Sequence, residues 1–172
     1  EDRKKALFWA TQARENFPWY QHEEIGYNYR MSNIVAGIGR GQLLHLQEHI
    51  DKKTAIYRRY EDKLQGLPLK MNPYTQDMVP NFWLSCLYLE EGCGVTFMEL
   101  LTRLQEADIE SRPIWKPMHM QPVFADRDFI TAKEASVNED VFARGLCLPS
   151  DIKMTEQEQD RVIEVIRSAF VR

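Results

Sequence analysis

Residues 115–119 gather an indole, an ammonium group and an imidazole in one proline-containing loop, Trp-Lys-Pro-Met-His. Arg112 adds a guanidinium group just before it, which suits a phosphate or a carboxylate. Such a set resembles the edge of a ligand site. The same residues would also suit a structural loop in which Trp115 packs inward and His119 hydrogen-bonds locally. The residues by themselves leave both interpretations open.

A second segment, Gly26-Tyr-Asn-Tyr-Arg-Met-Ser-Asn33, places an amide and a guanidinium group, those of Asn28 and Arg30, just before a predicted helix. The first N–H groups of a helix lack intrahelical acceptors, and the helix dipole favours negative charge there. The segment is therefore a reasonable place for an anion. Alternatively, it is a structured loop in which Asn28 forms a turn, and this interpretation also stays open.

Two further patterns have a chemical and a structural interpretation. The sequence His45-Leu-Gln-Glu-His49 matches the H-x-x-E-H pattern of one class of zinc protease, but neither a third ligand nor a cleft is marked. We interpret it as the polar face of a helix and predict no metal site. Gly37, Gly39 and Gly41 lie inside a helical pattern and not between a strand and a helix. We predict that they let another helix approach closely, and not that they hold a phosphate.

The elements that must position these segments include several predicted helices. Apolar periodicity predicts a helix over 3–15 and a long one from an N-cap at Ser32 to about Leu64. Capping boxes, Thr96 with Glu99 and Thr155 with Glu158, begin two more. One or two short helices are expected within 126–145, with Gly145 at a C′ position.

Strands are predicted over 82–89, 109–114 and 146–149. The order of elements indicates an α+β fold, with a small three-stranded sheet covered mainly on one face. The loop 16–31 is rich in aromatic residues and must pack on another subunit, a ligand or its own core. These rings are Trp19, Tyr20, Tyr27 and Tyr29.

Composition excludes several classes of protein. The chain has 172 residues and a net charge of −4, which opposes nucleic-acid binding, and no apolar run is long enough to span a bilayer. Three cysteines without C-x-x-C spacing argue against a disulfide framework and for a reducing compartment, so we expect a cytoplasmic protein. The chain opens at Glu1 without an initiator methionine, and we expect a fragment of something longer.

Three segments that fall in order, 26–33, 112–119 and 145–150, resemble the DegT/DnrJ/EryC1/StrS family of sugar aminotransferases. The segment 11–15, with His22 and Glu23 ahead of Gly26, is most similar to the branch that acts on UDP-linked 4-keto-6-deoxy-N-acetylhexosamines, as in bacillosamine-type pathways. The resemblance implies a pyridoxal phosphate enzyme of the aspartate aminotransferase fold type. Such an enzyme works as a homodimer and moves an amino group, usually from glutamate, to a keto carbon of a nucleotide-linked deoxysugar.

The resemblance also implies a division of labour. Residues 1–30 would be the tail of the large cofactor domain with an interface loop, and residues 31–172 the small C-terminal domain. Asn28 would bind the cofactor phosphate of the neighbouring subunit, and Arg30, His22, Trp115 and His119 would contact the nucleotide-sugar or line its entrance.

The lysine that holds the cofactor in this family lies upstream of the region that the chain resembles. The chain would therefore carry no catalytic residue, would be inactive by itself and would not bind the cofactor alone. Lys116 does not match the family lysine. The alternative function is a stand-alone module that binds nucleotide-sugars, or regulates, without catalysis.

Overall fold

A computed structural model of the chain describes residues 1–131 and 136–171. The chain forms two compact units, Glu1–Leu46 and Gln47–Arg172. The division predicted at residue 30 concerns the architecture of a larger enzyme and stays a prediction. Within the described ranges, no helix combines the length and the apolar character that crossing a membrane requires.

The first unit contains helix α1, Asp2–Ala10, and helix α2, Asn33–Leu43. The helix predicted over 3–15 is shorter than expected, because Gln12 and Ala13 have positive φ angles of 75° and 48°, which end a right-handed helix. Ser32 is the N-cap of α2, as predicted, and its hydroxyl accepts a hydrogen bond from the N–H of Val35 at 3.3 Å.

The single long helix predicted from Ser32 to Leu64 is wrong. Leu44 and His45 form a turn that separates α2 from α3, which runs from Leu46 to Lys63. The N–H groups of both turn residues bond three residues back, to Gly41 and Gln42, which tightens the end of α2. Three glycines in the preceding helix lower its propensity to continue.

The glycines of α2 meet no other helix of the first unit. Beyond its chain neighbours and the main chain of its own helix, a Cβ atom built on any of the three would have no atom of the described residues within 4 Å. The close approach of another helix stays a prediction, and α2 contains no buried residue.

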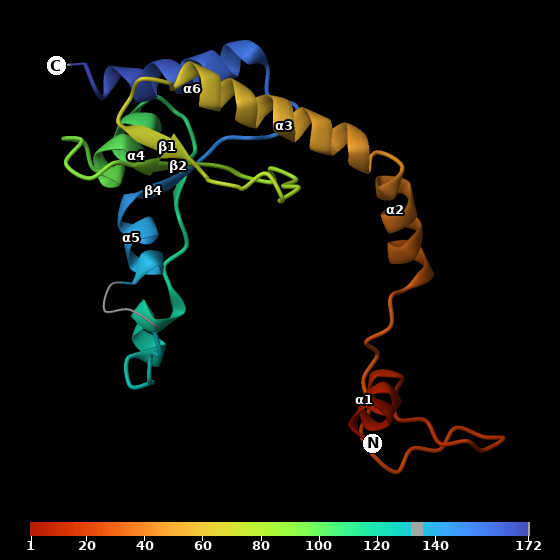
Figure 1. The fold of residues 1–172 in the computed structure, drawn as a ribbon. Helices are drawn as coiled ribbons and strands as arrows, with labels where there is room; N and C mark the ends of the chain where they lie inside the picture. The colour runs from red at the N-terminus through yellow and green to blue at the C-terminus, as the bar shows by residue number, and fades with distance from the viewer. Residues whose placement is uncertain (132–135, 172) are drawn as a thin grey trace. The chain divides into compact units, whose positions relative to one another are not determined.

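The second unit is an α+β structure around one antiparallel sheet (Figure 1). The described residues form four strands, in the order β1-β2-β4-β3, where three were predicted. Sequence patterns did not indicate β1, because it has three residues and is too short to show alternation. Strands β2 and β3 are shorter than predicted, and β4 has the predicted length but begins one residue earlier. The strands are β1, Leu69–Met71; β2, Ser85–Leu89; β3, Arg112–Pro113; and β4, Gly145–Leu148.

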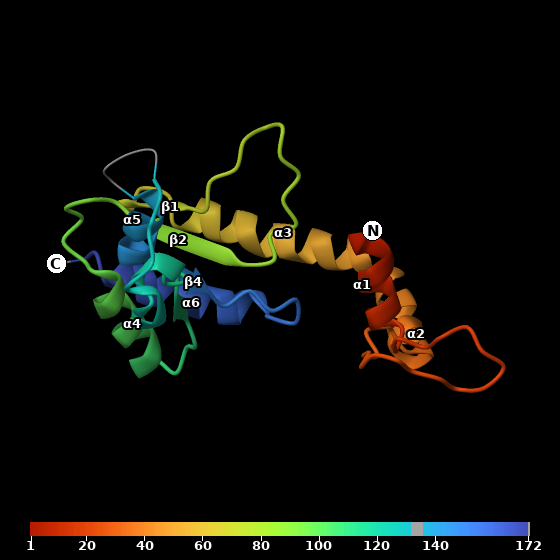
Figure 2. The same cartoon turned by 90° about the horizontal axis from the view of Figure 1, so that it is seen from below.

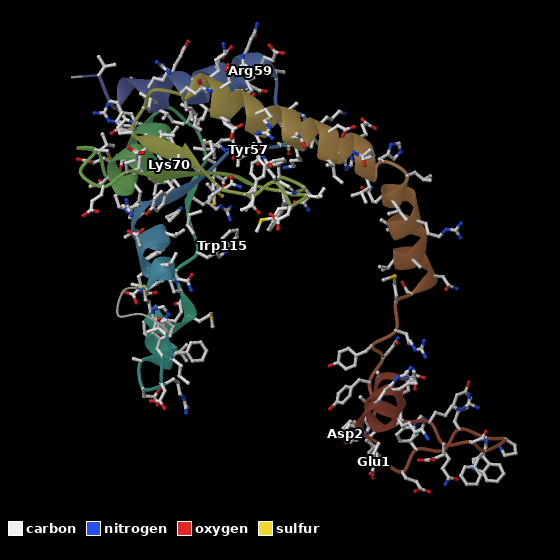
Figure 3. The ribbon with its side chains drawn as sticks, in the orientation of Figure 1. Glu1, Asp2, Tyr57, Arg59, Lys70 and Trp115 are labelled. Atoms are coloured by element: carbon white, nitrogen blue, oxygen red, sulfur yellow. The ribbon has the colours of Figure 1, made fainter. Side chains whose placement is uncertain are left out.

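Helix α3, with α4 (Phe97–Glu106) and α6 (Glu156–Ser168), supplies the helical side chains of the core. Both predicted capping boxes are confirmed at the starts of α4 and α6. The apolar faces of the helices meet Leu87, Leu89, Leu146 and Leu148 of the sheet. Figure 3 shows Tyr57 beneath α3, where its ring stacks on the ring of Phe82 at 4.2 Å.

Polar contacts tie α3 to α6 and to the sheet. The fully buried Tyr60 hydroxyl donates to the carbonyl of Pro149 at 2.9 Å. The buried Gln159 amide donates to the carbonyl of Ile56 at 2.8 Å. Because buried polar groups cost free energy unless they are paired, these bonds help to select one arrangement of the helices.

Helix α5, Val137–Arg144, lies on the side of the sheet opposite α3 and α6 (Figures 1 and 2). It is one of the short helices predicted within 126–145. The Arg144 Nε atom donates to the Asp140 carboxylate at 2.8 Å, and both side chains reach the Tyr88 hydroxyl of β2. This cluster holds α5 against the sheet.

Gly145 does not have the role predicted for it. Its φ of −103° and ψ of 145° are those of a strand, and β4 begins at this residue directly after α5. The conformation needs no glycine, but the space does. An added Cβ would lie 2.5 Å from the carbonyl oxygen of Val141 and would overlap the side chain of Ile114.

Candidate functional site

In the first unit, the loop after α1 folds back onto the end of that helix, and Gly26 permits the close approach. The Tyr27 N–H donates to the carbonyl of Trp9 at 2.8 Å, and the Gln12 N–H donates to the carbonyl of Tyr27 at 3.1 Å. A Cβ atom at Gly26 would overlap main-chain atoms of Gln12 and Ala13. These contacts place the start of the predicted anion segment against the helix end.

Hydrogen bonds to the same end of the helix fix the tautomer of His22. Its Nδ1 atom lies 2.9 Å from the carbonyl oxygen of Gln12 and 3.2 Å from that of Ala13. A carbonyl oxygen only accepts hydrogen bonds, so Nδ1 must carry the proton that it donates. In the neutral ring, Nε2 is then a hydrogen-bond acceptor.

Asn28 forms a turn and still keeps its amide donors. Its Oδ1 atom accepts a hydrogen bond from the Arg30 N–H at 3.2 Å. Within the part of the chain that the structure describes, neither the Asn28 Nδ2 group nor the Arg30 guanidinium has a hydrogen-bond or ion-pair partner. The turn and the anion interpretations of this segment are therefore compatible. The amide and the guanidinium group can each donate hydrogen bonds to phosphate oxygens.

A shallow cavity of about 690 Å³ includes both His22 and Asn28 in its lining. Glu24 also lines it, but its carboxylate pairs with Lys5 and accepts a hydrogen bond from the Trp9 indole N–H at 2.7 Å. The hydrogen bond from Lys5 holds the pKa of Glu24 below its usual value. Lys5 thus offsets one negative charge at the wall of this cavity.

The aromatic side chains of the loop stay exposed within this chain. Tyr20 and Tyr29 are 78% and 77% exposed, and the Arg14 guanidinium covers one ring, that of Tyr20, at 4.2 Å. Trp19 and Tyr27 are also exposed. A group of exposed aromatic side chains of this extent is typical of a surface that contacts a protein partner or a ligand.

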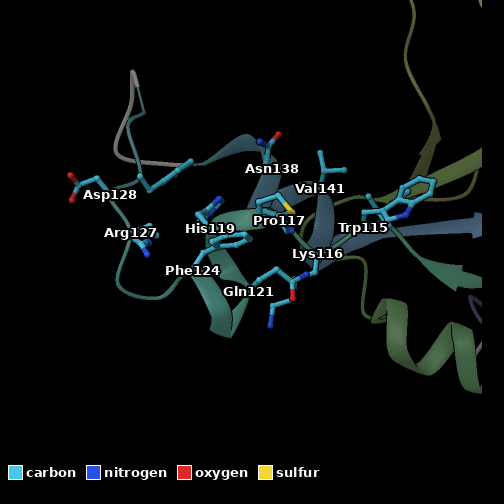
Figure 4. A pocket seen from close by; sticks show the side chains of 13 residues that line it. Trp115, Lys116, Pro117, His119, Gln121, Phe124, Arg127, Asp128, Asn138 and Val141 are labelled. Atoms are coloured by element: carbon cyan, nitrogen blue, oxygen red, sulfur yellow. The ribbon is translucent and has the colours of Figure 1, made fainter. Parts of the chain in front are cut away.

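In the second unit, the segment after β3 and the helix α5 enclose a cavity of about 830 Å³ (Figure 4). Trp115, Lys116 and His119 of the predicted loop all contribute to its lining. The turn Met118–Met120 (η1), which follows Pro117, directs this part of the chain along α5, and a second turn, Pro122–Phe124 (η2), follows. The segment 115–119 therefore borders a cavity, and its interpretation as the edge of a ligand site stays a prediction.

His119 is held from two sides. Its Nε2 atom lies 2.8 Å from the Glu139 carboxylate of α5, and its ring stacks on the ring of Phe129 with 3.7 Å between centroids. Because a carboxylate accepts, Nε2–H is the donor, and Nδ1 is left for another contact. Glu139 and Phe129 were not identified from the sequence, since they lie far along the chain from His119 and match no motif with it.

Trp115 does not pack inward. Its side chain is 65% exposed, on the segment that leaves the sheet after β3 (Figure 3). Its ring stacks with that of Trp83 at 6.4 Å between centroids, and Trp83 is also exposed. The structural-loop interpretation of Trp115 is therefore wrong, and two accessible indoles stand together beside the cavity.

The remaining patterns are not brought into either cavity. His45 lies in the turn before α3, so His45 and His49 do not share one continuous helix. Among residues 1–131 and 136–171, no cluster of three or more His, Cys, Asp or Glu side chains could hold a metal ion. Arg112 pairs with Glu110, whose carboxylate lies 2.6 Å from Nη2.

Comparison with known proteins identifies one aminotransferase family. Residues 2–167 match the model of the DegT/DnrJ/EryC1/StrS aminotransferase family. The chain is 46% identical to the Bacillus subtilis protein "Putative pyridoxal phosphate-dependent aminotransferase EpsN", over 97% of this chain and 43% of that protein. It is 32% identical to the GDP-perosamine synthase of Caulobacter vibrioides, over 86% of this chain and 39% of that enzyme. The chain thus spans about two fifths of the length of these relatives.

Solved structures share the fold. DesV of S. venezuelae, solved in complex with a ketimine intermediate, matches 99% of this chain and 44% of its own, with a TM-score of 0.78 and 23% identity. PseC of Helicobacter pylori, an aminotransferase involved in the biosynthesis of pseudoaminic acid, matches 97% of this chain and 45% of its own, with a TM-score of 0.78 and 17% identity. On the match over residues 2–167, this chain belongs to the DegT/DnrJ/EryC1/StrS aminotransferase family.

Proposed function

We propose that the chain is the C-terminal part of a pyridoxal phosphate-dependent aminotransferase that transfers an amino group to a keto carbon of a nucleotide-linked deoxysugar. The observation that carries this proposal is the Asn28 turn in a chain of this family: it presents an amide and a guanidinium group without protein partners among the described residues. The UDP-linked 4-keto-6-deoxy-N-acetylhexosamine remains the predicted substrate, with glutamate as the usual amino donor.

Asn28 would hold the cofactor phosphate of a neighbouring subunit in a homodimer. Its Oδ1 is engaged by the Arg30 N–H at 3.2 Å, so the turn orients the amide and both Nδ2 hydrogens are available to phosphate oxygens. The exposed rings of the loop, such as Tyr20 and Tyr29, support a cross-subunit location, because a second chain would bury them. When bound, pyridoxal phosphate supplies an electron sink for moving the amino group.

The other proposed residues bind and orient the sugar nucleotide. Arg30 would contact its diphosphate, because a planar guanidinium can bind phosphate oxygens in pairs. His22 would accept a hydrogen bond at Nε2 from a sugar hydroxyl, since its Nδ1 proton is held by the Gln12 carbonyl at 2.9 Å. In the second unit, Trp115 would stack on a base or on the apolar face of the sugar. His119 would use Nδ1, since Glu139 holds its Nε2.

The lysine that attaches the cofactor would come from the large domain of the enzyme. Lys116 lines the cavity of the second unit but belongs to the substrate loop in this proposal. Lys53 is also unsuited, because its amine donates to the carbonyls of Trp83 and Ser150. We therefore propose that the 172-residue chain does not turn over by itself. It would function in a cytoplasmic enzyme without a metal, nucleic acid or membrane partner.

The role of Asn28 can be tested by cofactor titration in the longer enzyme that contains this chain. Loss of a hydrogen bond to a charged group costs about 1.5–3 kcal/mol, so Asn28→Ala should raise the cofactor dissociation constant about 10- to 150-fold. Asn81→Ala is a matched control, because the Asn81 Oδ1 also accepts a bond from the N–H two residues on, that of Trp83, at 3.1 Å. Equal cofactor affinity in wild type and Asn28→Ala would refute the assignment.

The inactivity of the isolated chain has its own test. Treatment of the 172-residue chain with pyridoxal phosphate and borohydride should label no single lysine stoichiometrically, and transaminase assays should give no product. A stoichiometric adduct at one lysine together with turnover would contradict the proposal. Calorimetry of the isolated chain with UDP-sugars tests the alternative function, a stand-alone module. Binding of a UDP-sugar by a chain that has no catalytic role in a longer enzyme would favour this module. The cavity beside α5 offers it a binding site within one unit.

A further inference from the structure

Two of the three cysteines face each other across the middle of the sheet. Cys86 of β2 and Cys147 of β4 are register partners in the antiparallel pair. Their Sγ atoms lie 3.5 Å apart, although the residues are 61 positions apart in the chain. The sequence has no C-x-x-C motif, so the pairing was not visible before the sheet was known.

The main-chain hydrogen bonds show which kind of pair this is. The Cys86 N–H donates to the Asn72 Oδ1 at 3.1 Å, and the Cys86 carbonyl accepts from the Asn72 N–H at 2.8 Å. Both main-chain groups of Cys86 therefore point toward the β1 side and away from β4. Cys86 and Cys147 form a non-hydrogen-bonded pair, in which Cα atoms lie about 4.5 Å apart and side chains approach most closely.

That geometry lies within the range of a protein disulfide, for which Cα atoms are usually about 4.4–6.8 Å apart. Side-chain rotation must bring the two sulfurs together, and the main chain can stay in place. The structure holds both residues as free thiols.

Exposure and acidity differ between the two thiols. Cys147 is 9% exposed and Cys86 is more exposed, but Cys147 lines a cavity of about 630 Å³, together with Trp115 and with Arg112, its register partner on β3. The hydrogen bond between the two thiols lowers the pKa of Cys147 and raises that of Cys86. Of the two, Cys147 is therefore the one that more readily provides a thiolate, which is the nucleophile in disulfide exchange.

We propose that Cys86 and Cys147 are a redox modification site that closes to a reversible disulfide by exchange with a low-molecular-weight disulfide. The Cys147 thiolate attacks one sulfur of the small disulfide, forms a mixed disulfide and releases one small thiolate. The Cys86 thiol gives up its proton, and its thiolate attacks the Cys147 sulfur and releases the second small thiolate. The two cysteines are oxidised by two electrons, and the small disulfide is reduced to two thiols, which take up the two protons.

Cys93 is an internal control for this chemistry. It lies in the loop after β2, where its thiol donates to the carbonyl of Val95 at 3.1 Å. No other cysteine is its strand partner among the described residues. A cross-link that involves Cys93 would therefore contradict the geometry described above.

The test is mass spectrometry of the folded 172-residue chain after incubation with oxidised glutathione and alkylation with N-ethylmaleimide. The expected product is a chain about 2 Da lighter before alkylation, from the loss of two hydrogens, with only Cys93 alkylated. Peptide mapping should show a Cys86–Cys147 cross-link, and dithiothreitol should restore three reactive thiols. Oxidation should also raise the Tm, because the cross-link restricts the unfolded chain.

The variants make the outcome decisive. Cys93→Ser should form the cross-link as wild type does, whereas Cys86→Ser should stop at a glutathione adduct on Cys147. If folded wild type keeps three alkylatable thiols, or collects glutathione adducts without a cross-link, the proposal is overturned. A loss of two hydrogens that persists in Cys86→Ser would overturn it as well. Mapping on wild type alone suffices if a variant fails to fold. The test does not depend on the proposed aminotransferase function.

Discussion

Replacing Gly145 by alanine tests whether the packing between α5 and β4 requires the absence of a side chain. The residue has φ −103° and ψ 145°, so alanine suffers no main-chain strain. The added methyl group would lie 2.5 Å from the carbonyl oxygen of Val141 and would overlap the Ile114 side chain. Ile114 can turn aside, but the carbonyl is part of the last turn of α5 and cannot move without disturbing the helix.

The expected magnitude follows from two opposed terms. Overpacking a filled site costs about 1–3 kcal/mol, and a clash with main chain belongs at the upper end. Gly→Ala also stabilises by about 0.4–1 kcal/mol through the unfolded chain. We expect Gly145→Ala to lower the free energy of unfolding by about 2 kcal/mol. In a protein of this size, that corresponds to a Tm lower by about 4–8 °C.

Urea titration followed by circular dichroism and tryptophan fluorescence measures this change. Gly39→Ala is the control, because outside its own helix its Cβ would meet no atom of the described residues within 4 Å. It should leave stability unchanged or raise it by up to about 1 kcal/mol, through helix propensity. Ile114→Ala should rescue part of the loss, so that the double variant is more stable than the sum of the single effects predicts. A stability of Gly145→Ala within about 0.5 kcal/mol of wild type, the usual range of surface substitutions, would refute the packing argument.

Two further predictions concern buried and titrating groups. Tyr60→Phe removes the hydroxyl that donates to the Pro149 carbonyl at 2.9 Å and so takes away the hydrogen-bond donor of that carbonyl. The free energy of unfolding, measured by urea titration, should therefore fall by about 1–3 kcal/mol. An unchanged midpoint would show that this hydrogen bond does not contribute to stability. A hydrogen bond from Arg144, and a weaker effect of one from Tyr88, hold the pKa of Asp140 below its usual value. The ionised Asp140 therefore stabilises the fold at pH values above its unfolded-state pKa. This stabilisation is lost as the pH falls through the lowered folded-state pKa. The stability difference between wild type and Asp140→Asn should therefore be largest near neutral pH and shrink below about pH 4, whereas a pH-independent difference would contradict this linkage.

The N-termini of several helices could be predicted from the sequence. Thr96 with Glu99, and Thr155 with Glu158, form capping boxes whose partners are three residues apart, and both are present. Ser32 likewise caps α2. These bonds close within one turn of chain, so residue type and spacing alone specify them. The order of the predicted helices and strands also indicated the α+β class.

The tertiary structure decided what depends on contacts between distant segments. The three-residue strand β1 exists because its neighbour β2 pairs with it, and no local pattern of apolar residues predicts this strand. The break at Leu44 separates two helices, although the spacing of their apolar residues predicts one continuous helix. The exposure of Trp115, the Glu139 partner of His119 and the facing thiols of Cys86 and Cys147 all arise from chain segments that folding brings together.

For the candidate site, the sequence determined the kinds of side chain and their local spacing, as in the Asn28–Arg30 turn. Only the folded chain determined which donor of each group is engaged by protein and which remains for a ligand. The physical reason is that a hydrogen bond between neighbours in sequence depends on local main-chain geometry, whereas a contact across many residues forms only after the loop between them has closed and the surrounding core repays that loss of entropy.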